Sequence, residues 1–184
     1  VLREVIQPVV RGMESEGIIY TGFLYAGLMI DPQGGIKVLE FNCRMGDPET
    51  QPIMMRLKSD FSVIVEHAIN GTLDQVEAEW DRRTALGVVL AAANYPDTPR
   101  KGDVITGLPA HKAKQPEDAH VFHAGTTLQG GKVVTNGGRV LCVVALGTMV
   151  KAAQKRAYEV ADGIHFDGCQ MRRDIGWRAI SSRK

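Results

Sequence analysis

The spacing of apolar residues predicts helices in three regions. Residues 53–70 are expected to form one or two helices ended by Gly71, and residues 149–163 a further helix. The chain also opens on apolar residues at i, i+3 and i+4 spacing, which predicts an amphipathic helix, strained by Pro8, that ends near residues 12–17: Leu2, Val5, Ile6, Val9, Val10 and Met13. The chain thus begins within an element and without Met, so we expect a fragment of a longer protein.

Two other regions have the composition of β-strands. Residues 18–30 and 36–44 are rich in apolar and β-branched residues, and the turn sequence DPQGG between them predicts an antiparallel hairpin. A polar stretch at residues 72–83 follows the predicted helices. After it, apolar runs broken by Gly and Pro predict a small antiparallel β module, at residues 85–93, 104–108, 121–128, 132–135 and 139–146.

This order of elements predicts an α+β fold in two modules, residues 1–80 and residues 81–184. The charge supports the division, because residues 1–80 hold 6 Lys or Arg against 12 Asp or Glu, whereas residues 81–184 hold 16 against 9. The basic residues are scattered among apolar strands and aromatic residues make up only 6% of the chain. We therefore expect no nucleic-acid binding; the second module either binds phosphate or faces an acidic neighbour.

Cysteine and hydropathy patterns place the chain among cytoplasmic proteins. No run approaches the roughly 18 consecutive apolar residues that a membrane helix needs. The three cysteines, Cys43, Cys142 and Cys169, lie far apart without a CxxC pair, so we expect reduced and mostly buried thiols in place of disulfides or zinc. The expectation is a cytoplasmic monomer without a membrane partner.

The second predicted strand carries the clearest candidate chemistry. Because side chains alternate along a strand, Glu40, Asn42 and Arg44 share one face. The residues between them are expected to face the core: Leu39, Phe41 and Cys43. Neighbours on the polar face lie about 6.6 Å apart, close enough for both to approach one cation.

A carboxylate and a carboxamide on a rigid strand suit magnesium, which takes oxygen ligands and usually keeps only one or two protein groups beside nucleotide phosphates. Arg44 would add a fixed cation for charge that develops on a transferred phosphoryl group. The residues alone leave a second interpretation open, since a polar strand face can simply be solvated.

Two stretches of the chain, residues 20–30 (YTGFLYAGLMI) and residues 39–52 (LEFNCRMGDPETQP), resemble the signature region of the glycinamide ribonucleotide synthetase (phosphoribosylamine–glycine ligase) family. The resemblance continues to the far end of the chain. It runs through Tyr95-Pro96 and residues 101–105, 121–126, 135–141 and 174–178.

The resemblance implies that residues 1–80 are the C-terminal part of an ATP-grasp domain and that residues 81–184 are the family's small, β-rich C-terminal domain. It implies that Glu40 and Asn42 bind a Mg²⁺ or Mn²⁺ ion that bridges the phosphates of ATP. It also implies ATP-dependent joining of 5-phosphoribosylamine and glycine through a glycyl phosphate, in purine biosynthesis, with Arg44 steadying the acyl phosphate. The family's N-terminal half would precede Val1, so we expect the chain alone to be inactive.

Other residues are weaker candidates for substrate contacts. Asp47 and Glu49 follow the metal strand and either meet the substrate's amine or ribose or cap the helix predicted from residue 53. Lys101 and Arg139 are the candidates for the sugar phosphate. The segment 136–139 (NGGR) either cradles a phosphate or forms a hairpin turn.

Two rival functions remain from the sequence. One is a different ATP-grasp ligase or a carboxylase, which shares a Glu-x-Asn-x-Arg strand. The other is a non-catalytic binding module.

Overall fold

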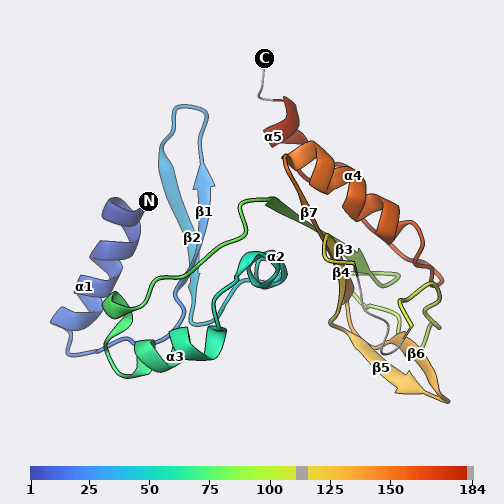
Figure 1. Ribbon diagram of the computed structural model, residues 1–184, viewed down its shortest axis with the longest axis horizontal. Helices are drawn as coiled ribbons and strands as arrows, with labels where there is room; N and C mark the ends of the chain where they lie inside the picture. The colour runs from blue at the N-terminus through green and yellow to red at the C-terminus, as the bar shows by residue number, and fades with distance from the viewer. Residues whose placement is uncertain (111–115, 182–184) are drawn as a thin grey trace. The chain divides into compact units, whose positions relative to one another are not determined.

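The computed structural model describes residues 1–110 and 116–181 (Figure 1). The chain divides into two compact units, the first comprising Val1–Asp47 and Lys58–Glu79 and the second Pro48–Leu57 and Trp80–Lys184. Both contain helices and antiparallel strands, which confirms the α+β prediction. The boundary predicted between residues 80 and 81 stays a prediction. No helix of the described residues is long and apolar enough to cross a membrane.

The first unit combines short helices with one hairpin. Its elements in chain order are a π-helical turn η1 (Leu2–Ile6), α1 (Gln7–Ser15), β1 (Tyr25–Ile30), β2 (Ile36–Asn42), α3 (Phe61–Ile69) and a 3₁₀ turn η2 (Leu73–Gln75). Asp60 caps α3, because its side chain accepts a hydrogen bond from the Ser62 N–H at 2.8 Å.

The opening helix is confirmed, and it ends at Ser15, within the predicted range of residues 12–17. Pro8 lies in the first turn of α1, two residues after the π-helical turn η1 ends, so the hydrogen-bond pattern changes from π-helical to α-helical beside the proline. The helix continues through Gly12 and ends in a Schellman motif. There Gly17 has φ +81° and the Ile18 N–H donates to the Met13 carbonyl at 2.9 Å.

The hairpin is confirmed, but β1 is shorter than the predicted strand. Residues 18–24 leave the sheet: Ile19 is 91% exposed and Gly22 has φ +143°, which a strand does not accommodate. The two strands pair antiparallel, with Gly27 opposite Glu40 and Leu28 opposite Val38. The register therefore shifts by one residue, and Leu39 is the extra residue of a β-bulge.

The prediction that one face of β2 belongs to the core is wrong. Leu39 is 64% and Phe41 40% exposed, and Cys43 is exposed as well. A two-stranded sheet flanked by short helices supplies too little apolar surface to bury them. Only Cys142 of the three thiols is fully buried and Cys169 is half-buried, so the expectation of mostly buried cysteines is also wrong.

The second unit contains the larger sheet. Its elements are α2 (Thr50–Arg56), β3 (Thr84–Ala91), β4 (Ala119–His123), β5 (Thr126–Gln129), β6 (Lys132–Thr135), β7 (Arg139–Gly147), α4 (Val150–Ala161) and α5 (Trp177–Ser181). The three-stranded sheet has the order β3-β7-β4 and is antiparallel throughout, while β5 and β6 form a separate hairpin. The predicted antiparallel β module with one long helix is thus confirmed.

Two predicted strands of this unit differ from the structure. Residues 104–108 make only isolated bridges, between Val104 and Val134 and between Thr106 and His165. The strand predicted at 121–128 is interrupted at Gly125, where an added Cβ would lie 2.7 Å from the Gly137 Cα. This close backbone approach breaks the strand into β4 and β5, and only glycine fits it.

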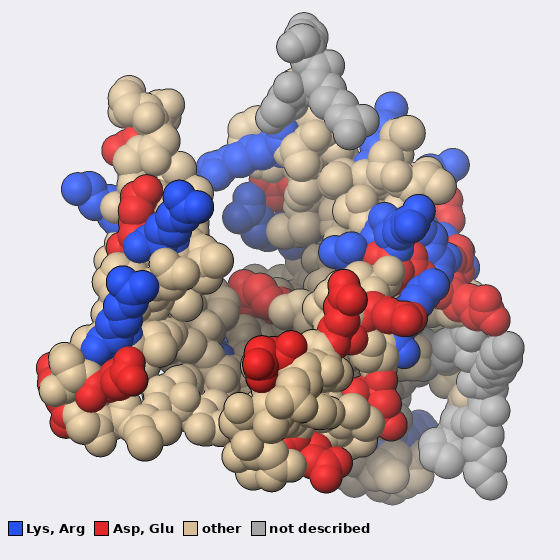
Figure 2. Space-filling model, turned by 60° about the vertical axis from the view of Figure 1, so that its left-hand side comes forward, with Lys and Arg blue, Asp and Glu red and all other residues tan. Residues whose placement is uncertain are grey.

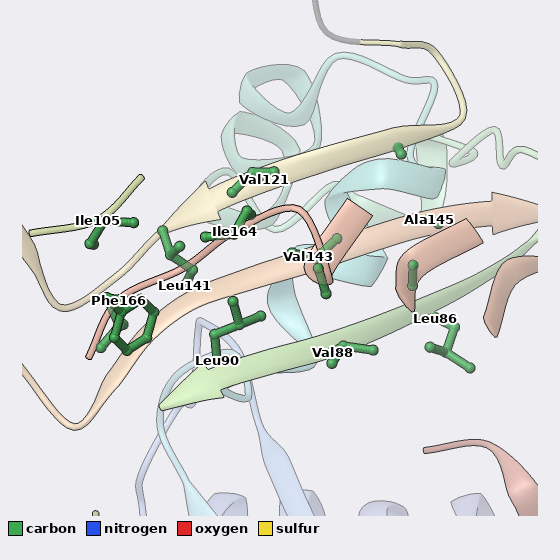
Figure 3. Packing of buried hydrophobic residues seen from close by; sticks show 14 of the residues in the cluster. Leu86, Val88, Leu90, Ile105, Val121, Leu141, Val143, Ala145, Ile164 and Phe166 are labelled. Carbon is green, nitrogen blue, oxygen red and sulfur yellow. The ribbon is translucent and has the colours of Figure 1, made fainter. Parts of the chain in front are cut away.

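The core of the second unit lies between the sheet and α4 (Figure 3). Its sheet side includes Leu90 and Leu141, both with no exposed surface. The helix contributes small residues at four-residue spacing, all fully buried: Ala153, Ala157 and Ala161. On the opposite face of the sheet, Gly87 leaves room for Pro52 of α2, whose Cγ would lie 3.3 Å from an added Cβ. Helices thus cover both faces of this sheet.

Replacing Leu90 by Ala is expected to destabilise the second unit by about 2–5 kcal/mol, because a fully buried leucine leaves a cavity when truncated. Leu128→Ala is the matched control, since Leu128 is 74% exposed and its truncation is expected to change stability by less than about 0.5 kcal/mol. Urea unfolding of both variants measures the difference. Equal stability of the two variants would contradict the assigned core.

Charged side chains of both signs are interspersed on the face shown in Figure 2. In the second unit several arginines have carboxylate partners: Arg156 lies 3.0 Å from Asp118 and Arg100 lies 2.8 Å from Asp103. These ion pairs join residues of the same unit, so they leave its excess of basic over acidic residues unchanged.

Candidate functional site

The polar face of β2 begins immediately after the bulge. Because Leu39 is the extra residue, regular alternation resumes at Glu40, and Glu40 and Asn42 lie on one face of the hairpin. Glu40 pairs with Gly27 and Asn42 with Tyr25 of β1. The Glu40 side chain is exposed, whereas Asn42 is half-buried at the end of the strand. The structure thus brings a carboxylate and a carboxamide together at neighbouring positions.

The Asn42 side chain indicates that this face of β2 is suited to bind a ligand with a hydrogen-bond acceptor. Its Nδ2 atom is buried without a hydrogen-bond partner in the described residues, which is costly unless a ligand supplies an acceptor. A phosphate oxygen is such an acceptor. No cluster of three or more His, Cys, Asp or Glu residues exists within 1–110 and 116–181. Glu40 and Asn42 present two oxygen-bearing side chains, of the kind that Mg²⁺ takes as ligands.

Arg44 lies beyond the strand, since β2 ends at Asn42 and not at residue 44 as predicted. Its exposed guanidinium donates from Nη1 to the Met45 carbonyl at 3.0 Å. This bond uses one of the five donors of the group and leaves others for an anionic ligand. Arg44 can therefore still bind an anion, although it lies in the bend after β2 and not in the sheet.

Tyr20 fixes the segment that precedes the hairpin. Its hydroxyl donates to the Phe23 carbonyl at 2.6 Å. The pKa of Tyr20 is raised by desolvation, followed by its hydrogen bond and charge interaction with Cys43. The phenol thus stays neutral and ties residues 20–23 to the end of β2. No pattern in the sequence predicted this contact.

The two acidic candidates lie in different units, Asp47 in the first and Glu49 in the second. Both are exposed. Helix α2 begins at Thr50, three residues earlier than predicted, so Glu49 occupies its N-cap position. Its side chain makes no capping hydrogen bond, and the capping interpretation is therefore wrong for Glu49.

Arg139 lines a cavity of about 430 Å³ on the face of the sheet opposite α4. The floor is apolar, and the polar side chains at its wall include Tyr95, Gln170 and Arg172. Gly138 allows Tyr95 to lie against the backbone next to Arg139, because an added Cβ would lie 2.5 Å from the Tyr95 ring. A cavity with two arginines and an apolar floor suits a small phosphorylated molecule.

Two of these wall residues are held by their own partners. The Gln170 side chain donates to the Ala92 carbonyl at 3.1 Å. Arg172 donates twice to Asp174, at 2.9 and 2.6 Å, and this hydrogen bonding raises the pKa of Arg172 and lowers the pKa of Asp174. The guanidinium of Arg172 is therefore paired with its own carboxylate at the cavity wall.

Lys101 does not share this cavity. Its side chain is exposed, and the cavity wall is formed by other residues. The hairpin-turn interpretation of residues 136–139 is wrong, because β6 pairs with β5 while β7 pairs with β3 and β4. The segment instead crosses close to Gly125, whose carbonyl accepts the Asn136 N–H at 2.7 Å.

A second cavity, of about 540 Å³, is bounded by the start of β3 and by α2. Two of its arginines bond to Asp81: Arg56 donates to the Asp81 carbonyl at 3.1 and 3.0 Å, and Arg83 lies 2.7 Å from the Asp81 carboxylate. These bonds tie α2 to the sheet.

Comparison with known families decides the relationship. The model of the phosphoribosylglycinamide synthetase C domain matches residues 85–178, and the model of that enzyme's ATP-grasp (A) domain matches residues 1–50. This chain belongs to the phosphoribosylglycinamide synthetase family. Within that family, β1 and β2 fall in the ATP-grasp part and the three-stranded sheet in the C domain.

The sequences of individual relatives align with nearly the whole chain. Phosphoribosylamine–glycine ligase from Ralstonia nicotianae is 66% identical over 180 residues, and that from Vibrio cholerae is 61% identical over 181 residues. Each alignment covers 98% of this chain and 42% of the relative. The crystal structure of phosphoribosylamine–glycine ligase from Thermotoga maritima has a TM-score of 0.78 and 40% identity, and the match covers 95% of this chain and 42% of that one. The chain thus spans less than half the length of these synthetases.

The sequence prediction missed three residues that line the cavity beside Arg139. Tyr95, Gln170 and Arg172 were not predicted as site residues, although Tyr95 lay within a motif that carried the resemblance. Gln170 and Arg172 reach the cavity from a segment far along the chain, and no local pattern marked them.

Proposed function

We propose that this chain supplies the C-terminal part of a phosphoribosylamine–glycine ligase. The complete enzyme would join 5-phosphoribosylamine and glycine with hydrolysis of ATP, yielding glycinamide ribonucleotide, ADP and phosphate for purine biosynthesis. One observation carries the proposal: the chain matches relatives of that name over 98% of its length.

Glu40 and Asn42 are proposed to hold a divalent ion, Mg²⁺ or Mn²⁺, beside the phosphates of ATP. The ion, when bound, would neutralise charge on the phosphates. Asn42 suits this role because a phosphate oxygen would satisfy its buried Nδ2 atom.

Other residues of the chain bind and orient the substrates in this proposal. Arg44 holds the glycyl phosphate through the donors that its bond to Met45 leaves over. Arg139 binds the sugar phosphate of 5-phosphoribosylamine at the 430 Å³ cavity. Asp47 and Glu49 meet the amine or ribose, and Lys101 assists with charge from outside the cavity.

The partner that completes the site would be an N-terminal region equivalent to the part of the relatives that this chain does not span. The lysines and the flexible loop that grip ATP would come from that region, so the chain alone is expected to be inactive. The complete enzyme is expected to be a cytoplasmic monomer.

The test uses a fusion of this chain to the N-terminal region of the Ralstonia nicotianae relative. We call this fusion protein the assembled enzyme. With ATP, glycine and 5-phosphoribosylamine, we expect equal amounts of ADP and glycinamide ribonucleotide, identified by mass spectrometry, and none from the chain alone. Release of ADP with a different acid or amine only would favour another ATP-grasp ligase. No product with any acid, together with intact folding, would favour a binding module.

A further inference from the structure

Gly27 lies directly opposite Glu40 in the hairpin and has no side chain to occupy the shared face. A Cβ added to Gly27 would lie 3.0 Å from the Glu40 Cγ and 3.7 Å from its Oε1. The Glu40 side chain therefore lies across the space that any other residue at position 27 would fill.

The bulge explains why the contact occurs at this pair. The register shifts between Gly27 and Leu28, with Leu39 as the extra residue, and a bulge changes the direction of the side chains beside it. A glycine within a strand commonly marks such a close approach. Gly27 has no positive φ, so alanine suits its backbone and the substitution reports on the side-chain contact alone.

We propose that Gly27 is a positioning residue for Glu40, whose empty side-chain position sets the direction in which the carboxylate points. The inference rests on the proposed function, in which Glu40 holds a divalent ion. Because the contacted atom belongs to a flexible side chain, an added methyl group would displace the Glu40 carboxylate and leave the backbone in place.

The test uses the assembled enzyme with four substitutions: Gly27→Ala, Gly12→Ala, Glu40→Gln, and Gly27→Ala combined with Glu40→Gln. Gly12 is the matched control, since an added Cβ there meets no atom within 4 Å. Binding of Mn²⁺ in the presence of ADP is measured by electron paramagnetic resonance, and folding by the thermal midpoint.

We expect Gly27→Ala to weaken Mn²⁺ binding by about tenfold, the lower end of the effect of changing a residue that orients a metal ligand, with a thermal midpoint close to that of Gly12→Ala. In the Glu40→Gln background, Gly27→Ala should have no further effect on Mn²⁺ binding, because the carboxylate that it displaces is gone.

Wild-type Mn²⁺ binding by Gly27→Ala, beside impaired binding by Glu40→Gln, would overturn the inference and leave the proposed function intact. Loss of the folded transition in Gly27→Ala would also overturn it, because the glycine would then serve the hairpin's folding. Unchanged binding in Glu40→Gln would instead overturn the metal assignment on which the inference rests.

Discussion

Glu40→Gln is expected to lower the kcat of the assembled enzyme by about 100- to 1,000-fold, the usual cost of removing one fixed electrostatic group from a reacting centre. The substitution keeps the shape of the side chain and removes its charge. Asn42→Ala should have an effect in the same range, since it removes the neighbouring oxygen donor on the same face of β2. Steady-state rates at saturating ATP and glycine measure both.

Glu77→Gln is the control for this prediction. Glu77 is an exposed residue of the same unit and lies outside β2, so its substitution removes an equal charge without touching the proposed site. We expect wild-type rates from it. If Glu40→Gln and Glu77→Gln were equally active, β2 would not carry the chemistry.

Arg139→Ala is expected to raise the KM for 5-phosphoribosylamine by about tenfold or more, because the loss of a hydrogen bond to a charged group costs about 1.5–3 kcal/mol. The KM for ATP should change little. Arg139→Lys should restore part of the affinity, since lysine keeps the charge and loses the forked geometry. Initial rates over a range of 5-phosphoribosylamine concentrations give both constants.

Arg82→Ala serves as the comparison for Arg139. Arg82 is an exposed arginine of the same unit that lines the other, 540 Å³ cavity. An equal rise of KM in both variants would mean that only the overall positive charge of this unit matters. A rise in the KM for ATP alone would place the nucleotide, and not the sugar phosphate, beside Arg139.

The parts of the fold that depend on neighbouring residues were predictable from the sequence. The hairpin at residues 25–42 follows from apolar strands around the DPQGG turn, in which the Asp31 carboxylate accepts N–H groups from Gln33 and Gly35. Helix α4 follows from its apolar spacing, which places Ala153 and Ala157 in the core. The polar pair Glu40 and Asn42 follows from simple alternation.

The errors arose where distant segments decide the structure. The bulge at Leu39 depends on the register with β1, and the break at Gly125 depends on the backbone of Gly137. The exposure of Phe41 depends on how much apolar surface the rest of the unit supplies, which alternation does not report. The cavity at Arg139 forms only when residues 170–175 return to the sheet.

The most direct test of the account measures the affinity of the assembled enzyme for Mn²⁺ with ADP, comparing the wild type with a variant that combines Glu40→Gln and Asn42→Ala. The account predicts that the variant keeps a normal thermal midpoint and loses the tight Mn²⁺ signal. The same Mn²⁺ affinity in both proteins would contradict the claim that this strand holds the ion.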